Sequence, residues 1–72
     1  MTTIYVQLLD EGVDVWRPVA ATQISDQDYR IEGEVPKDEV WEFLPGSIVR
    51  CELKTFAEGE RGLTAVGVAG AE

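Results

Sequence analysis

Apolar and polar residues alternate along most of this chain, and a period of two is typical of a half-buried β-strand. The alternation is clearest over residues 47–56, where Val49, Cys51, Leu53 and Thr55 oppose Arg50, Glu52 and Lys54. Antiparallel strands with one face on the core and one face in water show this pattern. Weaker runs occupy residues 4–9, 13–24, 29–34 and 63–68. The sequence therefore predicts an all-β fold of five antiparallel strands.

The length of the chain limits how these strands pack. A domain of 72 residues buries roughly 60% of the surface that its unfolded chain exposes, so residues 1–72 are expected to form a single domain around one small core. A flat sheet of five strands would leave two open edges, which closure into a barrel removes. We therefore predict a small barrel similar to the Src-homology-3-like barrels, an analogy of fold that carries no function.

Turn residues divide the strands. Asp10-Glu11-Gly12 is typical of a hairpin turn in which the glycine adopts a positive φ. Pro18 has no N–H to donate, so the second strand should lie at an edge or bend near this residue. A short helical or 3₁₀ turn is predicted over residues 36–44, because Pro36 suits the first position of a helix and acidic residues follow it.

Charge and cysteine content indicate the setting of the protein. Fourteen carboxylates against six basic residues give a net charge of −8, which would repel a nucleic-acid backbone. We expect an acidic surface that keeps the domain soluble, or one that meets a basic partner. Cys51 is the only cysteine, and no signal peptide or membrane span is evident, so a reducing cytoplasm is the expected location.

Few residues offer catalytic chemistry. The chain has no histidine, and therefore no imidazole base or imidazole-dependent triad. Cys51 falls on the inner face of its strand and is interpreted as a buried, inert thiol. Asp26-Gln27-Asp28 lacks the glycine and the later glutamate of a calcium loop, so its acids are interpreted as solvated turn residues. Paired carboxylates elsewhere would support a small hydrolase or metal-dependent enzyme only if two of them converged in a cleft, which their spacing does not show. We expect no catalytic residue, no metal and no cofactor.

Two tryptophans are the candidate site. Valines at alternate positions take the inner face of the second strand, which places Trp16 on the outer face, where a large apolar residue is unusual. Trp41 and Phe43 lie two residues apart on the irregular segment. One interpretation is that both tryptophans cover the ends of the barrel as core. The other is an aromatic binding surface formed by Trp16, Arg17 and Trp41, with Tyr5 nearby, a composition found at interface hot spots.

Two stretches carry a resemblance to known sequences. Residues 8–19 read LLDEGVDVWRPV and residues 38–52 read DEVWEFLPGSIVRCE. The chain resembles a set of short bacterial proteins that share both signatures and have no established activity. The resemblance implies a free-standing bacterial domain and assigns no functional residue.

These observations favour a non-catalytic module that binds a protein or peptide. The alternative is an acidic inhibitor or immunity-type protein that neutralises a basic partner enzyme through complementary charge. Neither hypothesis involves a nucleic acid or a membrane. The chain is expected to be a monomer, or a homodimer paired through an open strand edge.

Overall fold

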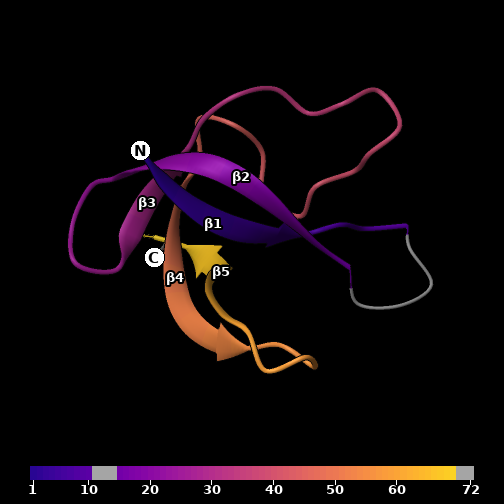
Figure 1. Ribbon diagram of the computed structural model, residues 1–72. Coiled ribbons are helices and arrows are strands. Elements are labelled where there is room, and N and C mark those ends of the chain that lie inside the picture. The colour runs from indigo at the N-terminus through magenta and orange to yellow at the C-terminus, as the bar shows by residue number, and fades with distance from the viewer. Residues whose placement is uncertain (11–14, 70–72) are drawn as a thin grey trace.

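The computed structural model describes residues 1–10 and 15–69, and it confirms the all-β prediction (Figure 1). Its strands are β1 (Thr2–Gln7), β2 (Trp16–Gln23), β3 (Asp28–Ile31), β4 (Ile48–Thr55) and β5 (Arg61–Val68). The predicted turn at Gly12 and the predicted inner-face position of Val13 lie outside the described residues.

The strands form one sheet in the order β1-β2-β3-β4-β5, and the sheet closes on itself. Each strand runs antiparallel to the next, so β1 and β5 point the same way and can close the sheet only as a parallel pair. They do so at Tyr5 and Thr64. Closure places the first and last strands side by side and gives β1 a neighbour on each side.

The interior of the closed sheet is the hydrophobic core. Its buried apolar residues are Ile4, Val6, Val19, Ala21, Tyr29, Ile31, Trp41, Val49, Cys51 and Ala65. The alternation predicted this inner face for β1, β2, β3 and the first half of β4. The prediction of an inward position is wrong for Leu53, which is 60% exposed. The end of β4 extends past the other strands with β5, so its inward side no longer faces the core (Figure 1).

Pro18 lies in the half of β2 that pairs with β1 alone among the described strands. It is opposite Tyr5, and pairing of β2 with β3 begins only at Ala21. The missing N–H of Pro18 is therefore tolerated at an edge, as predicted from the sequence.

The predicted helical turn at residues 36–44 is wrong, since the described residues contain no helix. The Glu39 N–H donates to the Pro36 carbonyl, which makes one turn. The chain then becomes extended beside the end of β1, where the Leu9 N–H donates to the Val40 carbonyl and the Glu42 N–H to the Gln7 carbonyl. Trp41 thereby bridges Leu8. These bonds to β1 take the backbone groups that a second helical turn would need.

Candidate functional site

The structure separates Trp16 from Arg17 and Trp41, the other two residues predicted to form a binding surface. Trp16 and Arg17 are adjacent in β2, so their side chains point to opposite faces of the strand. Val19 and Ala21 are buried, which puts Arg17 on the inward side and Trp16 on the outer side. Trp41 is 5% exposed and belongs to the core, whereas Trp16 is half-buried.

Trp41 and Arg17 share one carboxylate. The indole N–H of Trp41 donates to Glu39 Oε1 at 2.9 Å, and the Arg17 guanidinium lies 3.4 Å from Glu39 Oε2. A buried indole N–H without an acceptor would be costly, so Glu39 makes the burial of Trp41 possible. This arrangement fits a structural role for Trp41 and Arg17.

Trp16 belongs to a different group, an aromatic cluster formed by Tyr5, Trp16 and Phe56. The Phe56 ring meets Tyr5 edge-on with ring centroids 5.1 Å apart, and it meets Trp16 in the same way at 6.3 Å. Each ring is partly exposed. Edge-to-face pairs of this kind stabilise one another beyond the apolar area that they bury. The cluster is thus a preformed aromatic surface on the outside of the closed sheet.

Gly62 makes room for this cluster. A Cβ atom at this position would lie 2.6 Å from Cε1 of Tyr5 and 3.2 Å from Cε2 of Phe56. The absence of a side chain on β5 therefore lets the Tyr5 ring lie across the strand and reach Phe56.

The β4–β5 turn holds Phe56 in place. The Phe56 N–H donates to the Glu60 carbonyl, and the Gly59 N–H donates to the Phe56 carbonyl. Gly59 has a φ of 89°, a conformation that glycine adopts at little cost. The tight turn fixes Phe56 at its base and presents Glu58 and Glu60 beside the ring.

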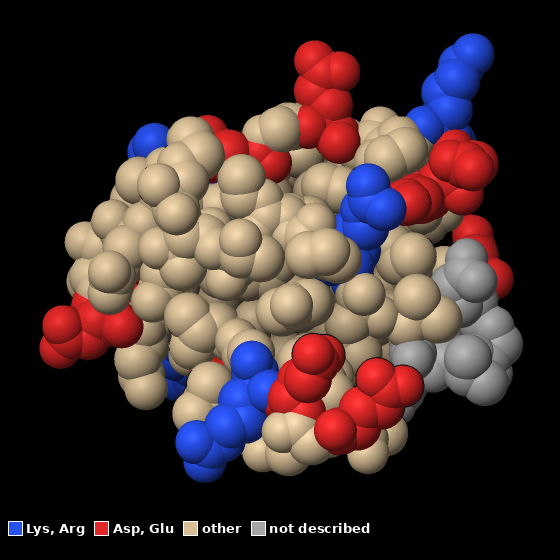
Figure 2. All heavy atoms as spheres, viewed as in Figure 1, with Lys and Arg blue, Asp and Glu red and all other residues tan. Residues whose placement is uncertain are grey.

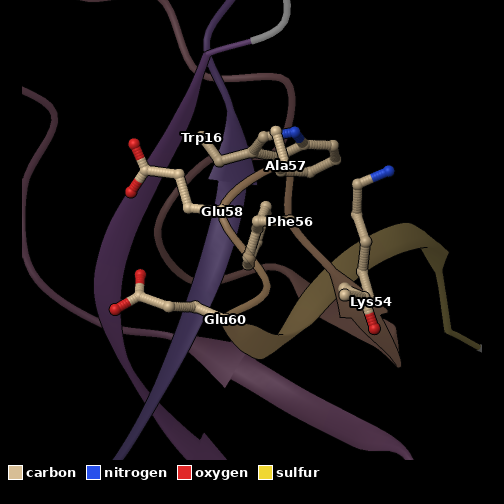
Figure 3. Close-up of a pocket in the computed structure, with 7 residues that line it drawn as sticks. Trp16, Lys54, Phe56, Ala57, Glu58 and Glu60 are labelled. Atoms are coloured by element: carbon tan, nitrogen blue, oxygen red, sulfur yellow. The ribbon is translucent and has the colours of Figure 1, made fainter.

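An open hollow of about 450 Å³ lies between Trp16 and this turn. Its lining residues are Trp16, Lys54, Thr55, Phe56, Ala57, Glu58 and Glu60. Figure 3 shows Lys54 rising on one side of Trp16 and Phe56, with the carboxylates of Glu58 and Glu60 on the other side. The Lys54 ammonium lies 5.7 Å from the centre of the Trp16 ring, within the range of a cation–π interaction. We call this the aromatic hollow.

A second, shallower hollow of about 180 Å³ contains Arg17 and Trp41, next to Pro18 and the Glu32–Glu34 segment. Glu32, which lines this hollow, accepts a hydrogen bond from the Thr22 hydroxyl at 2.8 Å and one from Arg30 at 2.9 Å. These two hydrogen bonds lower the pKa of Glu32. The charge of Glu32 is therefore already matched within the chain.

Cys51 is buried as predicted, at 2% exposure. Removal from water, with a smaller contribution from the charge of Asp28, raises the pKa of the thiol to about 11. The thiolate is therefore scarce at neutral pH. Within residues 1–10 and 15–69, no group of three or more cysteine and acidic side chains is arranged to hold a metal ion. The same residues include no helix long and apolar enough to cross a membrane.

Sequence reasoning missed Phe56, Lys54 and Ala57 as neighbours of Trp16. The alternation of inward and outward side chains along β1 and β2 places Tyr5 and Trp16 on the same outer face. Nothing in the local pattern indicates that the β4–β5 turn returns to that face, because this contact depends on closure of the sheet between β1 and β5.

The chain was compared with protein-family models, curated proteins and solved structures, and no match was found in any of the three. The resemblance to short bacterial proteins therefore stays a prediction.

Proposed function

We propose that this protein is a non-catalytic module that binds a protein or peptide through the aromatic hollow, on a small barrel of the Src-homology-3-like kind. The single observation that carries the proposal is the preformed cluster of Tyr5, Trp16 and Phe56 on the outer face. Partly exposed aromatic rings held rigidly beside a concave surface supply binding energy at little cost in conformational entropy.

One face of the molecule has the charge distribution of an interface. Figure 2 shows a face of the molecule whose centre is largely uncharged, with acidic and basic side chains around its border. Depletion of charged residues at the centre, with a polar rim, is typical of a protein interface. The binding surface proposed here keeps Trp16 and the neighbouring Tyr5 from the sequence-based patch and replaces Arg17 and Trp41 with Phe56.

The proposal is tested by blocking the hollow. Immobilised protein would be exposed to an extract of the source cells, and the proteins retained by each variant would be compared by quantitative mass spectrometry. Trp16→Ala removes a wall of the hollow, and Ala57→Leu fills it with the cluster intact. Ile24→Ala trims an exposed apolar residue on the β2–β3 turn and serves as the matched control.

We expect one partner to be retained by the wild-type protein and by Ile24→Ala, and lost by both hollow variants. Circular dichroism would verify that each variant is folded, and Ala57→Leu keeps the test decisive if Trp16→Ala unfolds. A partner retained equally by Ala57→Leu and the wild type would overturn the proposal.

An acidic inhibitor of a basic enzyme is the second candidate, favoured by the net charge of −8 and by the two carboxylates at the hollow. It makes a distinct prediction: the captured partner would be an enzyme that loses activity when this protein is added. Binding should also weaken steeply as salt rises. A captured partner whose activity is unchanged would exclude the inhibitor and favour the non-catalytic binding module.

A further inference from the structure

We infer that the aromatic hollow recognises a basic side chain of its partner, an arginine or a lysine, and that Lys54 occupies the same ring face in the free protein. This inference rests on the proposed function and specifies the chemistry of the ligand.

The first observation is the cation already seated on Trp16. Its ring holds the Lys54 ammonium at 5.7 Å, so this wall of the hollow has the geometry of a cation–π site. Lys54 is exposed, and it forms no ion pair with a described residue. A lysine on an exposed strand end is readily moved aside when, among the described residues, its contact with the ring is the only charge-specific interaction that holds it.

The second observation is a pair of carboxylates without a partner. Glu58 and Glu60 line the hollow, and neither forms an ion pair or a side-chain hydrogen bond with any described residue. Figure 3 shows both carboxylates on the same side of the hollow, opposite Lys54. Glu39 and Glu32, by contrast, each have a basic partner within the chain.

The two observations complement each other. A long basic side chain lying in the hollow would pack its apolar stem on Phe56 and bring its charge between the Trp16 ring and the carboxylates of Glu58 and Glu60. The net charge of −8 adds long-range attraction for a basic segment. An acidic or purely apolar ligand would satisfy the aromatic rings and leave the carboxylates opposed or unpaired.

Binding of a short basic probe would test the inference directly. The probe is an acetylated and amidated Gly-Arg-Gly-Arg-Gly peptide. Its control carries citrulline at both arginine positions, which keeps the shape and removes the charge. Titration at low salt would be followed by NMR, using the Trp16 indole N–H and the backbone amides of residues 54–60. We expect the arginine peptide to shift these signals with an affinity about fivefold above that of the citrulline peptide.

Charge variants locate the effect. The double variant Glu58→Gln/Glu60→Gln should weaken arginine-peptide binding about fivefold, while Asp26→Asn/Glu42→Gln makes the same charge change elsewhere on the exposed surface and should weaken it less than twofold. Lys54→Met should tighten binding about threefold, because it removes the ammonium that competes for the Trp16 ring and repels a basic ligand. Lys37→Met, in the exposed turn after Pro36, is its matched control.

Three results would overturn the inference: equal binding of the arginine and citrulline peptides, equal effects of the two acidic double variants, or equal effects of Lys54→Met and Lys37→Met. These outcomes are separable from failure of the proposed function. If Ala57→Leu abolishes partner capture while arginine shows no preference, the hollow binds a ligand of another chemistry. If the arginine peptide binds in the hollow but Ala57→Leu leaves partner capture intact, the proposed function fails.

Discussion

The two tryptophans place the same side chain in opposite situations. Trp41 is buried in the core and its indole N–H is satisfied by Glu39, so its apolar area contributes to folding. Trp16 stands on the outer face, where it packs against one other ring, holds a lysine over its face and borders an open hollow. The difference teaches that residue type alone does not distinguish core from binding surface. The partners of the ring do.

Replacing Trp41 should give the largest effect. Trp41→Ala leaves a large void in a small core, and removal of a buried aromatic side chain costs about 3–5 kcal/mol. A domain of this size has a total unfolding free energy of about 4–11 kcal/mol, so the variant should be close to unfolded. Urea unfolding followed by circular dichroism would measure the loss. Trp16→Ala should lose only about 1 kcal/mol, and a loss equal to that of Trp41→Ala would erase the distinction between the two residues.

Cys51, which lies in the core with Trp41, makes the stability of the protein depend on pH. The pKa of the Cys51 thiol is raised in the folded protein from 9.0 to about 11, so the unfolded state loses this proton first as the pH rises. Unfolding therefore becomes easier between about pH 9 and pH 11, by at most about 3 kcal/mol at 1.4 kcal/mol for each pH unit. The stability that the raised pKa of Cys51 contributes is fully present below pH 9 and is lost as the pH rises toward 11.

Urea midpoints for the wild type and Cys51→Ala across this range would measure the effect, because the variant lacks this proton while every other titrating group is kept. The difference in urea midpoint between the wild type and Cys51→Ala should become smaller as the pH rises. Parallel curves would show that the thiol titrates alike in the folded and unfolded states.

The aromatic cluster around Trp16 on the outer face depends on Gly62. In Gly62→Ala the new Cβ would lie 2.6 Å from the Tyr5 ring, so the ring has to move and the aromatic cluster should open. Overpacking of this kind costs about 1–3 kcal/mol. A double-mutant cycle with Tyr5→Leu would isolate the clash, and the cost of Gly62→Ala should largely disappear in the Tyr5→Leu background. An unchanged cost would assign the effect of Gly62 to the backbone of β5.

Local patterns in the sequence account for the strands and fail at contacts between distant segments. Alternation predicted the inner face of β1 and β2, the burial of Cys51 and the outward position of Trp16, because a strand's faces depend only on neighbouring residues. The pattern failed at Leu53, since β4 continues beyond the core, and at residues 36–44, since hydrogen bonds to β1 override a local helical signal. The aromatic hollow could not be predicted, because Trp16 and Phe56 meet only after β5 closes against β1.

The smallest effects distinguish the two interactions of the Glu39 carboxylate: Oε1 accepts the hydrogen bond from Trp41, and Oε2 forms the ion pair with Arg17. Glu39→Met removes the acceptor of the buried indole N–H, and an unsatisfied buried donor should cost about 1–2 kcal/mol. Arg17→Met removes only the ion pair, whose guanidinium side is 45% exposed, and should cost a few tenths of a kcal/mol, about 0.3, that shrinks in 1 M salt. Urea unfolding of both variants at low and high salt would compare them. A larger loss for Arg17→Met would mean that the guanidinium, and not the hydrogen bond, keeps Trp41 in the core, and the contrast with Trp16 would then rest on charge.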